Sequence, residues 1–369
     1  MSGIYLHIPF CKSKCAYCNF FSVVSERQRV DFLGALKKEA VERKDYLGGE
    51  EVRTIYFGGG TPSLLKPLEI AGILEVLYKN YKIIENPEIT LEANPDTVSK
   101  ESLLEYKSIG INRLSIGIQS FFDDDLQYLS RKHDSRHARQ VLDWAQEAGF
   151  QEVTMDLIYG IPTLTDEKWR KNLEIFFATG INHLSAYALT VEEKTALGQR
   201  INKGIAAPVD EDAVIRQYKI LMEMAENQGF EHYEISNFAR PGHYSKHNCI
   251  YWQGEKYLGL GPSAHSFDGV SRQWNVSSVK DYCESYSFER EELTLEDKHN
   301  EYIMTSLRTM WGVDTDYLRQ NFGIDCARMF KTCCKKYISE FKMYRKGKNY
   351  ILTDKGMLFA DGIAAELFV

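Results

Sequence analysis

Residues 5–20 read YLHIPFCKSKCAYCNF, and the three cysteines in this stretch decide the fold of the chain. Cys11, Cys15 and Cys18 follow the spacing C-x-x-x-C-x-x-C, and the next cysteine along the chain is Cys249. Three thiolates on one short loop can hold a [4Fe–4S] cluster in which one iron has no protein ligand. Such an open iron can bind a small molecule, as radical chemistry with S-adenosylmethionine (SAM) requires.

Two other interpretations of these cysteines are weaker. A zinc site usually takes four ligands, often as two separated pairs, so His7 would have to complete the set with the three cysteines. A disulfide framework is typical of short secreted chains, whereas this chain has 369 residues and only 8 cysteines. The remaining cysteines, apart from Cys249, have no metal-ligand spacing; they are Cys283, Cys326, Cys333 and Cys334.

The composition limits where in the cell the protein can act and which partners it can bind. No apolar leader precedes the first predicted strand, and no apolar run is long enough to span a bilayer. Free thiols and an oxygen-sensitive kind of cluster favour the reducing cytoplasm, with peripheral membrane contact still compatible. The formal net charge is −7. Because sequence-independent binding of nucleic acid needs a basic surface, we expect no nucleic-acid partner.

Short apolar runs alternate with amphipathic runs over the first half of the chain. The predicted strands are Ile4–Ile8, Thr54–Phe57, Ile89–Glu92, Arg113–Ile118, Glu152–Ile158 and His183–Ala188. The predicted helices between them are Glu26–Tyr46, Glu69–Tyr81, Lys100–Ser108, Ser135–Glu147 and Asp166–Phe177. This alternation predicts an α/β fold with a parallel sheet. Six units are fewer than the eight of a TIM barrel, so we expect an open partial (β/α) barrel.

The second half of the chain divides into two further parts. Glu211–Asn227 predicts an amphipathic helix that closes the barrel domain, residues 1–235. Residues 236–294 are rich in Gly, His, Asn and aromatic residues and predict an irregular connecting segment with a functional role. Residues 295–369 predict three helices, a hairpin turning at Gly347 and a final helix, which together resemble a winged-helix α+β domain.

Distinctive polar and glycine residues follow the ends of the predicted strands. Gly59, Gly60 and Thr61 follow the second strand, where glycines allow the backbone to approach a ligand closely. Glu92 ends the third strand, and Gln119 follows the fourth strand. Asp156 lies within the apolar fifth strand, where a carboxylate is costly unless it contacts a ligand or a structural hydrogen-bond donor. Because ligands bind at the C-terminal ends of barrel strands, we expect these residues to share one site.

These motifs together resemble the radical-SAM superfamily, and within it the branch similar to oxygen-independent coproporphyrinogen III oxidase. The resemblance rests on YLHIPFC at 5–11, GGGTP at 58–62, GIQSF at 117–121 and DLIYGIP at 156–162. It implies that Cys11, Cys15 and Cys18 bind the cluster. It also implies that the following residues hold SAM, contact a ligand or pack beside the cluster: Tyr5, Tyr17, Gly59, Gly60, Thr61, Glu92, Gln119, Arg131 and Asp156. Without the resemblance, Arg131 would pass for an ordinary surface charge.

Two functions compete within this branch. Coproporphyrinogen dehydrogenases carry a further cysteine two positions after the triplet, in the pattern C-x-x-x-C-x-x-C-x-C, where this chain has Phe20. They also carry an N-terminal extension, whereas the first predicted strand begins here within the first few residues. Both departures favour a resemblance to the haem chaperones of the HemW type. The alternative is an enzyme that decarboxylates coproporphyrinogen III oxidatively through a deoxyadenosyl radical.

The sequence H-N-x-x-Y-W distinguishes the HemW type and occurs here at residues 247–252. A neutral imidazole such as that of His247 can be an axial haem ligand, and aromatic rings can stack on a porphyrin. His243, His265 and Cys249 are alternative ligands, and a purely structural histidine is a further interpretation. The resemblance therefore implies a protein that binds a [4Fe–4S] cluster, SAM and haem and delivers the haem to an acceptor protein. The sequence leaves open which protein accepts the haem, which oligomeric state the chain adopts and whether SAM is cleaved.

Overall fold

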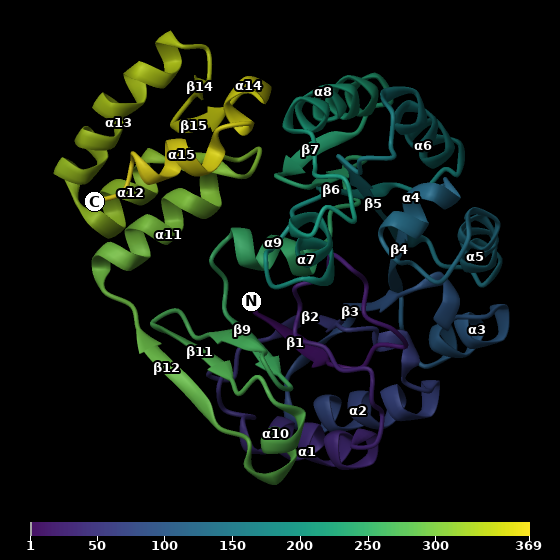
Figure 1. Cartoon of the computed structure of the whole chain (residues 1–369). Helices are drawn as coiled ribbons and strands as arrows, with labels where there is room; N and C mark the ends of the chain where they lie inside the picture. The colour runs from purple at the N-terminus through teal and green to yellow at the C-terminus, as the bar shows by residue number, and fades with distance from the viewer. Residues whose placement is uncertain (1) are drawn as a thin grey trace.

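The computed structural model describes residues 2–369 and has a sheet of six parallel strands at its centre (Figure 1). The six strands pair in chain order and lie within one or two residues of most of the predicted bounds. They are β1 (Ser2–Ile8), β2 (Val52–Gly59), β3 (Ile83–Ala93), β4 (Arg113–Gln119), β5 (Glu152–Tyr159) and β6 (His183–Ala188). The prediction of an α/β partial barrel is confirmed, and one further strand, Tyr257–Leu260, pairs parallel with the other edge of β1.

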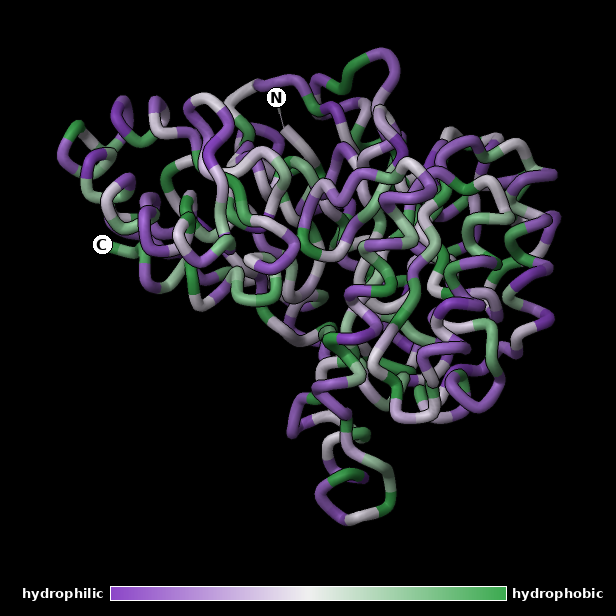
Figure 2. Tube along the Cα trace, turned by 90° about the horizontal axis from the view of Figure 1, so that it is seen from above, coloured by the Kyte–Doolittle hydropathy of each residue, from purple (hydrophilic) through white to green (hydrophobic). Residues whose placement is uncertain are grey.

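Helices α1 to α6 connect these strands and cover the outer face of the sheet, and α7 and α8 follow β6 (Figure 1). They are α1 (Arg29–Glu42), α2 (Pro67–Asn80), α3 (Lys100–Ser108), α4 (Asp123–Tyr128), α5 (Ser135–Glu147), α6 (Asp166–Ala178), α7 (Ala196–Asn202) and α8 (Glu211–Asn227). Several begin at a side chain that accepts a hydrogen bond from the first turn, such as Ser99 for α3 and Thr165 for α6. At the edge of the molecule, the turns of the helices that face outward are mainly hydrophilic (Figure 2).

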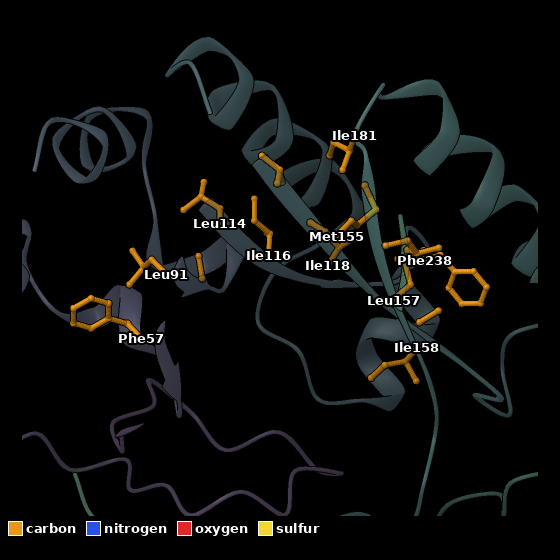
Figure 3. Packing of buried hydrophobic residues seen from close by; sticks show 14 of the residues in the cluster. Phe57, Leu91, Leu114, Ile116, Ile118, Met155, Leu157, Ile158, Ile181 and Phe238 are labelled. Atoms are coloured by element: carbon orange, nitrogen blue, oxygen red, sulfur yellow. The ribbon is translucent and has the colours of Figure 1, made fainter. Parts of the chain in front are cut away.

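The main core lies between the sheet and these helices. Residues alternate along each strand, so that Ile4, Leu6 and Ile8 of β1 are fully buried in the core that also contains Phe32 of α1. Figure 3 shows the same layer farther along the sheet, where large apolar side chains of β2 to β5 pack side by side. The opposite residues of each strand face the interior of the partial barrel, which leaves that space for polar and aromatic side chains.

The segment 236–294 is not irregular, and that expectation was wrong. It forms β8 (Asn237–Ala239), α9 (Lys246–Trp252), β9 (Tyr257–Leu260), β10 (His265–Phe267), β11 (Ser271–Asn275), α10 (Val279–Ser285) and β12 (Phe288–Glu292). Strand β7 (Glu231–Glu234) and β8 extend the sheet beyond β6, and β9 to β12 extend it beyond β1. These strands have three to five residues, which is too short for an alternation pattern to be recognised in sequence. The domain boundaries given above stay a prediction.

The C-terminal region forms three helices and a three-stranded sheet, as expected for a winged-helix-like module. The elements are α11 (Leu295–Leu307), β13 (Val313–Asp314), α12 (Thr315–Phe322), α13 (Ile324–Ser339), β14 (Met343–Lys346) and β15 (Asn349–Leu352). The final helix is divided in two, α14 (Asp354–Met357) and α15 (Ala360–Ala365). Within residues 2–369, no helix is both long and apolar enough to cross a membrane.

Candidate functional site

A cavity of ≈420 Å³ lies at the C-terminal ends of the parallel strands. It is lined by all the predicted site residues except Tyr5 and His247. The predicted residues that line it are Cys11, Cys15, Tyr17, Cys18, Gly59, Gly60, Thr61, Glu92, Gln119, Arg131 and Asp156. The strand topology therefore brings together residues that are up to 145 positions apart in the chain.

The cysteine loop and the GGGTP turn pack directly on each other. The backbone N–H of Gly60 donates to the carbonyl of Ile8 at 2.8 Å. A Cβ atom at position 60 would lie 2.7 Å from the carbonyl oxygen of Phe10 and 3.0 Å from Sγ of Cys11, so only glycine fits. Thr61 directs its hydroxyl toward the same sulfur, with Oγ1 at 3.6 Å from Sγ of Cys11. The turn thus forms one wall of the space beside the cysteines.

Arg131 joins three parts of the cavity wall. Its guanidinium donates to Oδ1 of Asn94 at 2.6 Å and to the carbonyl of Gly117 at 2.8 Å. The same group lies 3.3 Å from Sγ of Cys15. A guanidinium in this place can donate a hydrogen bond to the sulfur of a metal-binding cysteine. Arg131 is therefore built into the cavity wall and is not a free surface charge.

Two carboxylates face the interior of the cavity. Glu92 accepts from the hydroxyl of Tyr56 at 2.8 Å and from the backbone N–H of Gly59 at 3.1 Å. Asp156 accepts from the hydroxyl of Ser115 at 3.2 Å. Burial raises the pKa of each carboxyl group to about 7, and for Glu92 the nearby charge of Asp156 adds to the effect. Ionising either of these buried carboxyl groups therefore costs free energy. A cationic ligand in the cavity would stabilise the two negative charges.

The raised pKa of Glu92 gives a prediction for stability. Because the folded state binds this proton more tightly than the unfolded chain, Glu92 lowers stability progressively as the pH rises from about 4.5 to about 7. We expect Glu92→Gln to increase the free energy of unfolding at pH 8 by up to about 3 kcal/mol and to change it little at pH 4. Thermal denaturation of the ligand-free protein at the two pH values measures this difference. Equal effects at both pH values would contradict the account.

Tyr5 and His247 lie beneath the cavity and do not line it. Helix α9 packs against β1 and β2, and the carboxylate of Glu88 accepts from its first backbone N–H groups, those of Lys246 and His247. The rings of His247, Tyr56 and Tyr5 form one cluster. His247 stacks on Tyr56 at 4.9 Å between centroids, and the Tyr5 ring lies 6.0 Å from Tyr56 and 6.4 Å from His247. Because Tyr56 donates to Glu92, helix α9 supports the cavity from below.

Both ring nitrogens of His247 have hydrogen-bond partners. Nδ1 lies 2.8 Å from Oγ1 of Thr54, and Nε2 lies 2.9 Å from the hydroxyl of Tyr251. The side chain is 1% exposed, and burial lowers its pKa to about 3, so the imidazole is neutral. A neutral imidazole is the form that binds iron, but in this conformation no nitrogen is free to do so. Haem ligation by His247 stays a prediction, and it requires Tyr251 to move.

A second cavity of ≈770 Å³ lies on the other side of α9, between the strands β9 to β11 and the helices of the C-terminal module. We call it the aromatic cleft, because eight aromatic side chains line it. They are Tyr251, Trp252, Tyr257, Phe267, Tyr302, Trp311, Tyr317 and Phe322. Two cations also line it: Lys298, and Arg272, which forms a double hydrogen bond with Glu301. Both aromatic residues of the H-N-x-x-Y-W motif therefore face this cleft.

The alternative haem ligands lie outside both cavities. His243 is part-exposed, and its Nδ1 lies 2.9 Å from Glu152. His265 is exposed on β10 and stacks on Trp274 at 6.0 Å. Burial raises the pKa of the Cys249 thiol to about 12, which keeps it protonated and a poor ligand. Of the four candidates, His247 is the one with a hydrogen bond to a residue of the aromatic cleft, Tyr251.

Several residues of the cavity were not predicted from sequence. Asn94 donates to Oγ1 of Thr61 at 3.0 Å while it accepts from Arg131, so it connects two walls. Tyr56 carries the hydrogen bond to Glu92, and Tyr187 lines the wall at the end of β6. Tyr56 and Tyr187 could have been found from strand alternation, since each points inward near the C-terminal end of its strand. Thr190 and Glu192 follow β6 and line the mouth.

The donor set suits an iron–sulfur cluster better than a single ion. Within residues 2–369, no three His, Cys, Asp or Glu side chains converge closely enough to hold one metal ion. The three cysteines are instead distributed around one end of a cavity, with a cation, a hydroxyl and backbone groups beside them. Hydrogen bonds to sulfur are among the features that set the reduction potential of such clusters.

Comparison with known proteins agrees with this architecture. The model of the Radical SAM superfamily matches residues 5–176, and that of the HemN C-terminal domain matches residues 293–359. The solved structure described as "Coproporphyrinogen III oxidase (HemN) from Escherichia coli is a Radical SAM enzyme" superposes with a TM-score of 0.86. It is 23% identical, over 100% of this chain and 90% of that one, so it shows the shared fold. The fold and the cysteine loop define a protein of the radical SAM superfamily.

Sequence relatives define the family more closely. "Heme chaperone HemW" of Bacillus subtilis is 32% identical over 98% of both chains. The protein of the same description from Mycobacterium tuberculosis is 32% identical over 99% of this chain and 94% of its own. "Radical S-adenosyl methionine domain-containing protein 1, mitochondrial" of Danio rerio is 37% identical over 72% of this chain and 60% of its own. The chain belongs to the HemW family.

Proposed function

We propose that this protein is a cytoplasmic haem chaperone that binds a [4Fe–4S] cluster, SAM and haem and passes the haem to an acceptor protein. The observation that carries the proposal is the presence of two separate cavities on either side of α9. One contains the three cysteines together with Glu92, Asp156 and Arg131, and we call it the polar cavity after these groups. The other is the aromatic cleft, which contains Tyr251 and Trp252. A carrier that holds a cluster and a haem at once needs two such sites.

In the polar cavity, Cys11, Cys15 and Cys18 would hold the cluster. The cluster would supply an open iron and a source of electrons when bound. Glu92 and Asp156 offer negative charge for the ammonium and sulfonium groups of SAM, and Arg131 offers positive charge for its carboxylate. The Gly59-Gly60 backbone gives room for close approach. Tyr17, Thr61 and Gln119 complete the walls and limit the access of water.

The aromatic cleft suits haem, which is flat, apolar in its ring and anionic through its propionates. Aromatic rings from both sides of the cleft can stack on the macrocycle, and Lys298 offers a positive charge for a propionate. His247 lies directly behind Tyr251. When the Tyr251 hydroxyl leaves Nε2 of His247, that nitrogen becomes available to iron from the side of the cleft.

A haem titration tests this proposal. We expect one haem per chain to saturate the protein and to quench tryptophan fluorescence, because Trp252 and Trp311 line the cleft. Trp252→Ala should weaken haem binding about tenfold, the upper range for loss of one aromatic contact in such a site. Trp144→Ala on α5, outside both cavities, is the matched control. Haem binding that is unchanged in Trp252→Ala would remove the cleft from the proposal.

The second candidate function is that of a coproporphyrinogen III dehydrogenase. The shared fold and the intact polar cavity favour it. Phe20 occupies the position where those enzymes carry a further cysteine; its side chain is 70% exposed at the mouth of the cavity. A phenyl ring cannot replace a thiol in proton or electron transfer, and for this reason we prefer the chaperone function.

A further inference from the structure

The aromatic cleft contains a guanidinium group that several neighbours hold in place. Arg272 on β11 donates from Nη1 to the hydroxyl of Tyr257 at 2.9 Å, and its guanidinium carbon lies 5.1 Å from the centre of the Phe267 ring. Nε and Nη2 donate to the two carboxylate oxygens of Glu301 at 2.6 and 2.7 Å. The side chains of Arg272 and Glu301 are 30% and 34% exposed, and both line the cleft. A ligand in the cleft therefore meets an arginine that already holds a carboxylate.

This ion pair joins the two walls of the aromatic cleft. Arg272 belongs to β11 in the extension of the sheet, and Glu301 belongs to α11 of the C-terminal module (Figure 1). Among residues 2–369, it is the one ion pair between the C-terminal module and the rest of the chain. A backbone contact also joins them, from the N–H of Met310 to the carbonyl of Tyr233 at 3.1 Å. The module can therefore stay attached to the barrel when the ion pair opens.

Glu301 can leave Arg272 at a small cost in stability. Water screens a part-exposed ion pair, so such a pair contributes little to the free energy of unfolding. The guanidinium keeps its positive charge throughout the physiological pH range. Tyr257 and Phe267 contact the guanidinium independently of Glu301, so they keep it in the cleft after the carboxylate has moved. The two N–H groups that Glu301 releases then fit another carboxylate in the same double hydrogen bond.

We infer that Glu301 occupies the place of a ligand carboxylate, and that a propionate of the tetrapyrrole displaces it from Arg272. This inference rests on the proposed function, because it takes haem as the ligand of the aromatic cleft. The second propionate can approach Lys298, which lies one turn before Glu301 on α11 and also lines the cleft. A flat apolar molecule without a carboxylate cannot compete with Glu301 for the guanidinium. The ion pair thus selects for anionic tetrapyrroles, and its opening releases α11 from β11 as the ligand enters.

Titrations with haem and with haem dimethyl ester test the inference. We expect Glu301→Gln to tighten the binding of haem about fivefold, the upper range for a part-exposed ion pair, because the propionate no longer displaces a carboxylate. The affinity for the ester, whose propionate groups carry no charge, should stay unchanged in this variant. Arg272→Lys keeps the charge but loses the planar fork, so it should weaken haem binding about fivefold and leave the ester unaffected.

Glu69→Gln is the matched control. Glu69 on α2 forms a similar double hydrogen bond with Arg29, outside both cavities, so this variant should change neither affinity. Because Glu301→Gln and Arg272→Lys alter opposite members of the pair, a folding defect in one of them leaves the other as a test.

Two results would overturn the inference. One is an equal change in the affinities for haem and for the ester in Glu301→Gln, because Glu301 would then act on the shape of the cleft. The other is no change for either ligand in Glu301→Gln and Arg272→Lys. If Trp252→Ala weakens haem binding in the same experiments, the proposed function survives and this inference alone fails. If Trp252→Ala leaves haem binding unchanged, the placement of haem in the cleft fails together with this inference.

Discussion

Replacing Cys15 by alanine is expected to abolish the iron–sulfur cluster. After anaerobic reconstitution, the wild type should hold about four irons and four sulfides per chain, and the variant less than about one iron. Cys15 lies in the middle of the loop and beside the guanidinium of Arg131, so its loss leaves two thiolates and an unpaired cation at the cavity wall. Iron and labile sulfide content, with the absorption spectrum of the cluster, measure the effect.

A matched control uses a cysteine elsewhere. Cys333→Ala changes an exposed thiol on α13 and should leave the iron content unchanged. Zinc without labile sulfide in the anaerobically purified wild type would contradict the cluster assignment, and so would full cluster content in Cys15→Ala.

The second large effect that we expect is a loss of haem affinity when His247 is replaced. We expect His247→Ala to weaken haem binding about a hundredfold, equivalent to about 3 kcal/mol, because the iron loses its axial ligand. The Soret band should shift while the iron–sulfur content stays constant. His243→Ala and His265→Ala are controls of the same kind, since both side chains lie outside the aromatic cleft. If one of these variants loses the haem spectrum and His247→Ala keeps it, the ligand assignment is wrong.

Tyr251→Phe should have the opposite effect. Its hydroxyl lies 2.9 Å from Nε2 of His247, and removing it frees the nitrogen that iron needs. The loss of one net hydrogen bond of about 1 kcal/mol corresponds to about fivefold tighter haem binding. A haem affinity that falls in this variant would mean that the Tyr251 hydroxyl itself contacts the haem or its iron.

Much of the barrel and the polar cavity could be predicted from sequence because the signals are local. Each parallel strand is a short apolar run between helices, and its C-terminal end locates the site residues without any knowledge of side-chain packing. Glu92, Gln119 and Asp156 were found in this way, and all three line the cavity. Arg131 was different: its role depends on Asn94, which follows β3, and on Gly117 of β4, so only the family resemblance indicated it.

The position of His247 could not be predicted from sequence. It depends on the docking of α9 against β1 and β2, where Glu88 accepts from the helix N-terminus, 159 residues away in the chain. The aromatic cleft depends on how the C-terminal module packs against β9 to β11. The extra strands were missed because they are short and pair with distant partners. Long-range packing of this kind leaves no periodic pattern in the sequence.

One measurement tests the central claim most directly. The reconstituted protein, loaded with haem, is incubated anaerobically with SAM and a reductant, once with apomyoglobin as a probe acceptor and once with coproporphyrinogen III. We predict that haem passes to the acceptor and that the tetrapyrrole is recovered unchanged. Formation of protoporphyrinogen, with no transfer of haem, would contradict the account and establish the dehydrogenase function instead.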